Sequence, residues 1–199
     1  MKKNMCFSLG VCIMLTLCSC TLGKKQNDTP DQSKDAVMMT RESLEKAGIN
    51  VEELLKTLRT AFADEWMASY QYWMGAKLVQ EPTRSDVIKE LFEHYEEEMK
   101  HANLLANRLL QLGGDLRMFP HEWHKIGGCH YDSITNINVD SVLKENIVGE
   151  DCAIKFYEKL LKTVKDKDPV TEKMVVEILN DEIKHKKDLT TLLTALPKS

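Results

Sequence analysis

The sequence predicts an all-α fold, a four-helix bundle in which two antiparallel hairpins are joined by a long crossover. Four long segments repeat apolar residues with a helical period of about 3.6 residues. The chain has only nine Gly and five Pro among its 199 residues, which favours long helices with few turns. The connections within each pair of segments are about four residues long, whereas residues 113–139 are long enough to span a bundle.

Capping signals set the boundaries of the four helices. We expect the helices to cover residues 51–79, 84–112, 140–164 and 169–196. Asn50 is the predicted N-cap of the first helix, and Gly113-Gly114 end the second. Pro169 follows Asp168 and takes the first position of the fourth helix, where its missing N–H is tolerated.

The first twenty residues resemble a bacterial lipoprotein signal. Lys2 and Lys3 give a positive start, and the apolar run over residues 5–17 is short for a bilayer span. The run ends in Leu17-Cys18-Ser19-Cys20, which is similar to a lipobox with Cys18 in place of the usual small residue. We therefore expect residues 1–20 to be a signal peptide with Cys20 as the lipidation site; a plain secretory signal is the alternative.

The remaining chain divides into a tether and one domain. Residues 21–39 are mostly polar and predict a flexible tether, so the folded domain is expected over residues 40–199, with a short leading helix at 41–48. Export places the protein in the cell envelope or periplasm, with membrane contact through a lipid anchor only. The formal net charge of -4 disfavours a nucleic-acid partner, because neutralising phosphates requires a basic face.

The two predicted hairpins share one chemical pattern. In the first and third helices a Glu precedes a Tyr by seven residues, and in the second and fourth a Glu is followed by His after three. The pairs are Glu65/Tyr72, Glu150/Tyr157, Glu98/His101 and Glu182/His185. We interpret the pattern as an internal two-fold repeat.

Each of these glutamates interrupts the apolar stripe of its helix near the midpoint, so the four carboxylates should converge inside the bundle. Four buried, unpaired carboxylates would cost many kcal/mol, and two divalent cations with two imidazoles would offset that cost. Glutamate and histidine suit iron or manganese, and the lack of a thiolate pattern argues against zinc. The predicted ligands are Glu65, Glu98, His101, Glu150, Glu182 and His185.

The residues around this set have competing interpretations. The glutamates could instead be solvated, as Glu96 and Glu97 are expected to be, but their stripe positions argue against it. Tyr72 and Tyr157 either relay electrons or bond the carboxylates, or they simply pack. Asp181 is a candidate acceptor that orients His101 or His185, and a helix-surface position is the alternative.

These motifs resemble a known family. Glu65 with Tyr72, Glu98-Met-Lys-His101, Glu150 and Asp181-Glu182-Ile-Lys-His185 are similar to the ligands of bacterioferritin-type proteins in the ferritin-like di-iron superfamily. The crossover and third helix resemble Dps-like thioferritins, which carry two cysteines beside the di-iron site. Their Cys-x-Tyr and Gly-Glu-x-Cys-Ala-Ile segments are matched by Cys129-His-Tyr131 and Gly149-Glu-Asp-Cys152-Ala-Ile154. The resemblance covers about residues 50–196.

The resemblance implies a ferroxidase of oxidative-stress defence. Such a protein binds two iron ions per subunit, oxidises Fe(II) with hydrogen peroxide, and stores the ferric product in a homo-oligomeric shell of twelve. Manganese instead of iron and oxygen instead of peroxide stay open. Cys129 and Cys152 are implied as a redox pair; a disulfide that pins the crossover, or two packed thiols, are the alternatives.

Two other functions fit the same residues. A manganese catalase-like protein would dismutate peroxide with the same ligands. A non-catalytic metal-binding envelope protein would use the site for structure only.

Overall fold

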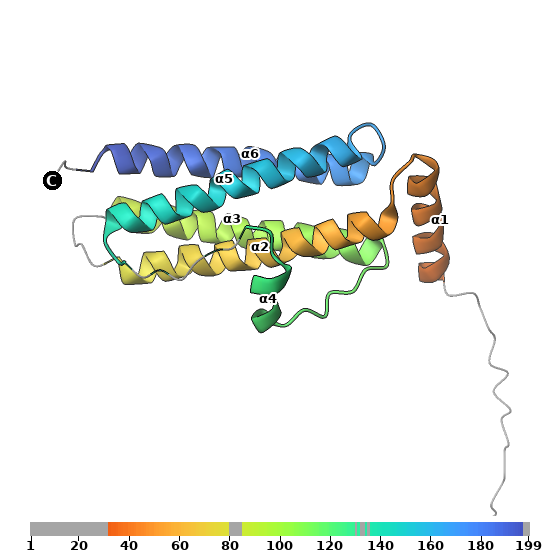
Figure 1. Cartoon of the computed structure of the whole chain (residues 1–199), viewed down its shortest axis with the longest axis horizontal. Helices are drawn as coiled ribbons and strands as arrows, with labels where there is room; N and C mark the ends of the chain where they lie inside the picture. The colour runs from red at the N-terminus through yellow and green to blue at the C-terminus, as the bar shows by residue number, and fades with distance from the viewer. Residues whose placement is uncertain (1–31, 80–84, 130, 132–133, 135, 197–199) are drawn as a thin grey trace, which may run out of the picture. The chain divides into compact units, whose positions relative to one another are not determined.

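The computed structural model describes residues 32–79, 85–129, 131, 134 and 136–196 (Figure 1). This part of the chain contains helices and no strand, so the all-α prediction is confirmed. The helices are α1 (Gln32–Lys46), α2 (Val51–Leu78), α3 (Ser85–Gln111), α4 (Pro120–Ile126), α5 (Val139–Val164) and α6 (Pro169–Thr194). None of the described helices is long and apolar enough to cross a membrane.

The predicted four-helix bundle is confirmed. Helices α2 and α3 form one hairpin, α5 and α6 form the other, and the crossover between α3 and α5 carries α4 (Figure 1). The side chain of Asn50 accepts a hydrogen bond from the amide of Glu53 at 3.1 Å and so caps α2. Gly113, at φ +71°, takes the left-handed conformation that ends α3.

The N-terminal helix differs from the prediction of a tether over residues 21–39. Residues 32–39 belong to α1, while residues 1–20, with Cys20, and 21–31 lie outside the described part of the chain. Leu44 of α1 is buried in the core, and Arg41 forms an ion pair with Glu52 of α2. Both contacts lie in the second half of α1, and the helix continues from there back through residues 32–39, whose polar composition alone suggested a flexible chain.

Helix α4 was not predicted. It has only seven residues, too few to show an apolar period, and it begins at Pro120. Trp123 of α4 stacks on Trp66 of α2, with ring centroids 5.4 Å apart. This contact lays the crossover along α2.

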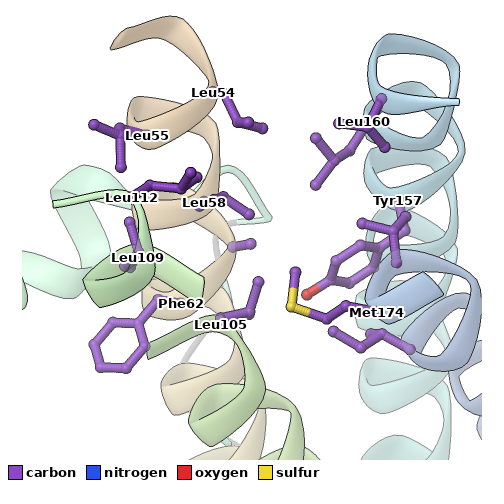
Figure 2. Packing of buried hydrophobic residues seen from close by; sticks show 14 of the residues in the cluster. Leu54, Leu55, Leu58, Phe62, Leu105, Leu109, Leu112, Tyr157, Leu160 and Met174 are labelled. Atoms are coloured by element: carbon purple, nitrogen blue, oxygen red, sulfur yellow. The ribbon is translucent and has the colours of Figure 1, made fainter. Parts of the chain in front are cut away.

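The apolar core consists of two clusters, one toward each end of the bundle. The first joins the start of α2 and end of α3 to the end of α5 and start of α6, and Figure 2 shows Leu58 and Leu105 facing Tyr157 and Met174. The second cluster contains Tyr72, Leu91, Leu143 and Leu189 from the other halves of the same helices. The glutamates and histidines singled out above lie at sequence positions between the two clusters, so they form a polar layer in the core.

Candidate metal centre

The six predicted ligands come together in this polar layer. They form two groups in which one ligand atom of each residue lies within 4.8 Å of the others. Glu98 and Glu182 belong to both groups, and every one of the six is at least 97 % buried. The groups are Glu65, Glu98, His101, Glu182 and Glu98, Glu150, Glu182, His185.

The two imidazoles face the carboxylates with Nδ1. His101 Nδ1 lies 3.0 Å from Glu98 Oε2 and 3.4 Å from both Glu65 Oε2 and Glu182 Oε1. His185 Nδ1 lies 3.1 Å from Glu98 Oε1, 3.1 Å from Glu182 Oε2 and 3.8 Å from Glu150 Oε1. One N–H cannot serve three oxygens well, whereas a cation between them can.

The opposite ring nitrogens are held by acidic residues across the bundle. His101 Nε2 lies 3.2 Å from Asp181 Oδ2 of α6, so Asp181 does contact one of the histidines. His185 Nε2 lies 2.7 Å from Glu97 Oε2 of α3, which makes the expectation of a solvated Glu97 wrong. A carboxylate on the outer nitrogen fixes the tautomer that leaves the inner nitrogen free for a metal.

The two tyrosines cross between the hairpins. Tyr72 of α2 donates its hydroxyl hydrogen bond to Glu150 Oε1 of α5, and Tyr157 of α5 donates to Glu65 Oε1 of α2. The interpretation of Tyr72 and Tyr157 as partners of the carboxylates therefore holds in this structure. Each hydroxyl orients the carboxylate of the opposite hairpin, as the internal repeat requires.

The electrostatics of the layer favour bound positive charge. Burial raises the pKa of Glu65 and of Glu150, and the charges of Glu182 and Glu98 raise both further. Burial works against a charged imidazole, but hydrogen bonds to Glu182 and Glu98 outweigh it and raise the pKa of His185 to about 12. The pKa of His101 is raised in the same way, against burial, by Glu182 and Glu65. The carboxylates therefore hold cationic imidazoles firmly.

Three carboxylate oxygens of the layer make no aligned hydrogen bond. Glu65 Oε2, Glu98 Oε1 and Glu150 Oε2 are buried and have no aligned hydrogen bond within the described chain, although imidazole nitrogens lie nearby. Buried carboxylate oxygens are normally paired. Two divalent ions, one in each group, fit this donor set of glutamate oxygens and imidazole nitrogens.

A third histidine lies beside the centre and was not singled out from the sequence. His94 of α3 is fully buried, and its ring stacks on His185 with centroids 4.0 Å apart. Burial, with the charge of His185, lowers the pKa of His94 to about 3. His94 is thus neutral at physiological pH.

The crossover docks onto the bundle beside Glu65 and Glu150. Cys129 and Cys152 form a disulfide between the crossover and α5, with Cα atoms 5.6 Å apart. Asp64 of α2 accepts hydrogen bonds from the amides of Gly128 at 2.9 Å and Cys129 at 3.1 Å. A Cβ on Gly149 would lie 2.7 Å from the Tyr131 ring, so this position needs glycine.

The sequence contained signals for two of the residues that it did not identify. Glu97 precedes Glu98 as Asp181 precedes Glu182, so the internal repeat pointed to it. His94 lies four residues before Glu98 and shares its helix face. No comparable signal marked Asp64, because its role depends on where the crossover docks.

Comparisons with known proteins agree with this arrangement. A family model described as a ferritin-like domain matches residues 55–199. The "DNA protection during starvation protein" of Pyrococcus furiosus is 30% identical over 159 residues, which cover 79% of this chain and 85% of that protein.

Solved structures give the same result. A dodecameric thioferritin, the bacterioferritin-related protein of Bacteroides fragilis, has a TM-score of 0.75 at 37% identity, covering 81% of this chain and 93% of that chain. Dps from Thermosynechococcus elongatus has a TM-score of 0.68 at 21% identity, covering 74% and 92%, and supports the fold alone. The resemblance found in the sequence is confirmed: the chain belongs to the ferritin-like family.

Proposed function

We propose that this chain is a ferroxidase that oxidises Fe(II) with hydrogen peroxide and so removes both reactants from the cell envelope. The observation that carries the proposal is the buried layer to which all four bundle helices contribute one glutamate, with Glu98 and Glu182 common to two ligand groups. Membership of the ferritin-like family is consistent with iron oxidation and storage.

Iron bound in the two groups supplies the redox chemistry: two Fe(II), one peroxide and two protons give two Fe(III) and two waters. Glu98 and Glu182 belong to both ligand groups and would serve both ions, while Glu65 and Glu150 would each serve one. His101 and His185 would bind through Nδ1 and would have to release the protons held there, while Asp181 and Glu97 keep the rings oriented. Tyr72 and Tyr157 hold the terminal carboxylates through their hydroxyls.

Stopped-flow oxidation of Fe(II) by peroxide tests the proposal. Glu98→Ala removes a residue common to both groups and is expected to reduce the rate to that of the uncatalysed reaction. Glu96→Ala is the matched control, because Glu96 is exposed on the same helix two residues away. An unchanged rate in Glu98→Ala would rule out this site, and oxygen release from peroxide would instead indicate dismutation.

Cys129 and Cys152 are proposed to act as a redox pair for the centre. Two thiols that convert to the disulfide release two electrons and two protons, which is what the reduction of one peroxide to two waters consumes. The support is their location, since Cys152 is two residues from Glu150 on α5 and its partner lies in the docked crossover. Peroxide added to the reduced, iron-loaded protein should consume two thiols per chain, and the Cys152→Ser variant should lose this electron source.

We also propose that the chain assembles into a homo-oligomer, a twelve-subunit shell like that of the Bacteroides fragilis thioferritin. Tyr70 and Trp73 of α2 stack on each other, yet are 57% and 39% exposed in the single chain, as expected for side chains that a partner covers. Light scattering should give a particle of many subunits. Trp73→Glu should reduce its mass, whereas Lys56→Glu, at an exposed polar position of the same helix, should not.

We propose that the chain is exported and anchored to lipid through Cys20, because its leader is similar to a lipoprotein signal. The full chain is expected in the membrane fraction, and Cys20→Ala is expected to move it to the soluble fraction.

We propose protection by iron oxidation and not by DNA coating, since the net charge of -4 provides no general attraction for phosphates.

A further inference from the structure

A third group of metal-ligating side chains lies beside the candidate centre. Glu90 and His94 come from α3 and Asp188 from α6, and one ligand atom of each lies within 4.8 Å of the others. Glu90 and His94 are four residues apart on one face of α3. Asp188 follows His185 by three residues, so the cluster lies one turn along the bundle from the second ligand group.

His94 distinguishes this cluster from an ordinary surface ion pair. The ring is 0% exposed, and neither ring nitrogen has an aligned hydrogen bond within the described chain. Glu90 Oε1 lies 3.2 Å from His94 Nε2, but outside the alignment that a hydrogen bond needs. A buried imidazole that makes no aligned hydrogen bond and faces two carboxylates offers, together with them, the donor atoms that a cation binds.

The internal repeat provides a comparison within the same molecule. Glu98 and Glu182 are 84 residues apart, as are His101 and His185. The same offset relates Glu90, His94 and Asp188 to three apolar residues, Met174, Ile178 and Leu104, which all pack in the first apolar cluster. On the side of the first apolar cluster, apolar side chains alone fill the space beside the centre. Packing therefore does not explain why polar residues occupy the corresponding three positions on the other side.

Neighbouring groups connect the cluster to the centre and leave it open to a cation. The His94 ring stacks on His185 at 4.0 Å and meets the edge of Tyr72 at 5.1 Å. The nearby ammonium of Lys184 is held by Glu97 at 3.3 Å. Glu90 and Asp188 are half-buried, so an ion can reach them from solvent without crossing the core.

We propose that Glu90, His94 and Asp188 form a third cation site, which binds a divalent first-row transition metal ion next to the second ligand group. Two carboxylates and one neutral imidazole neutralise such an ion and leave coordination positions for water. The inference rests on the proposed function only for the identity of the natural ion, Fe(II).

Cobalt(II) is a suitable probe, because it is not oxidised by air at such ligands and can be located by its anomalous scattering. Crystals of the full chain soaked with Co(II) should show an anomalous peak bounded by Glu90, His94 and Asp188, besides a peak in each ligand group of the centre. Peaks at the centre alone would overturn the third site and leave the proposed function standing. A peak at the third site alone would support it and contradict the proposed function.

Co(II) counting in solution gives an independent test. Asp188→Asn and Glu90→Gln keep the shape of half-buried side chains, and each should lower the number of Co(II) bound per chain by one in equilibrium dialysis. Glu93→Gln, an exposed position between Glu90 and His94, is the matched control and should leave the number unchanged. An unchanged number in both Asp188→Asn and Glu90→Gln would overturn the inference.

Discussion

At the scale of single residues, the imidazoles depend on acidic groups that do not face the metal positions. Glu97 Oε2 lies 2.7 Å from His185 Nε2, and hydrogen bonding to His185 outweighs burial and lowers the pKa of Glu97. Because this contact keeps the proton on Nε2 when a metal ion displaces the one on Nδ1, Glu97 should influence metal binding without touching the ion.

We predict that Glu97→Gln lowers the affinity for Co(II) by about 10- to 100-fold, as loss of a carboxylate behind a histidine ligand commonly does. Isothermal titration of the full chain measures the change. Glu96→Gln removes an exposed carboxylate from the neighbouring position and should leave the affinity unchanged. Equal affinities in the two variants would contradict the role of Glu97.

The residues that the sequence predicted and those that it missed differ in how they are positioned. Glu65, Glu98, Glu150 and Glu182 interrupt apolar stripes, so their burial could be inferred from helix periodicity alone. Glu97 lies at the edge of such a stripe, and whether it meets solvent or His185 depends on the facing helix. Periodicity within one helix does not contain that information.

At the scale of helices, the turn between α5 and α6 is fixed to α3 by a buried ion pair. Arg108 of α3 donates to Asp168 Oδ2 at 2.7 Å and to Thr171 Oγ1 at 2.7 Å. Asp168 also caps α6 by accepting from the amide of Thr171 at 3.1 Å. One carboxylate thus ends a turn, begins a helix and joins the two hairpins.

Asp168→Ala should lower the free energy of unfolding by about 3–5 kcal/mol, because it leaves Arg108 buried without a counter-charge and removes a cap. Urea unfolding followed by circular dichroism measures the loss. Asp140→Ala removes an exposed carboxylate from the first turn of α5 and should cost less than about 1 kcal/mol. A similar loss in both variants would show that burial of the ion pair is unimportant.

The disulfide joins an irregular segment to a regular helix. It closes a loop with a sequence separation of 23, and in the chain-entropy model such a closure stabilises by about 3 kcal/mol. The Cys129→Ser, Cys152→Ser double variant should lose about that amount in the same assay. Because Asp64 still binds the amides of Gly128 and Cys129, hydrogen exchange at these amides should rise less than in Asp64→Ala.

Helix lengths show where sequence-based prediction works for this fold. The long helices have strong apolar periods and caps, and their observed ends lie within two residues of the expected ones. Helix α4 was missed because a tertiary contact, the Trp66–Trp123 stack, holds it. Helix α1 was predicted too short because residues 32–39 are mostly polar. Short helices of this kind gain little from their own sequence.

At the scale of the whole molecule, the polar layer lies between the two apolar clusters, so its protonation affects the free energy of unfolding of the entire bundle. Above pH 6.5, His94 is neutral in both the folded and the unfolded chain, because its folded pKa is about 3. His185, with a folded pKa of about 12, and His101, also raised, keep protons that the unfolded chain has lost above its usual histidine value of 6.5. The folded state then binds more protons than the unfolded state.

The free energy of unfolding of the metal-free protein, kept in chelator, should therefore fall as pH rises above 6.5. The expected decrease is about 1 kcal/mol or more per pH unit, because each extra proton bound by the folded state gives a slope of about 1.4 kcal/mol per pH unit. Metal ions replace those protons, so affinity should rise with pH while the stability of the metal-loaded protein changes far less. Urea unfolding at pH 7, 8 and 9, with Co(II) or with chelator, measures both trends. A chelated protein that becomes more stable over this range would mean that the imidazoles are not held as cations by Glu182 and Glu98.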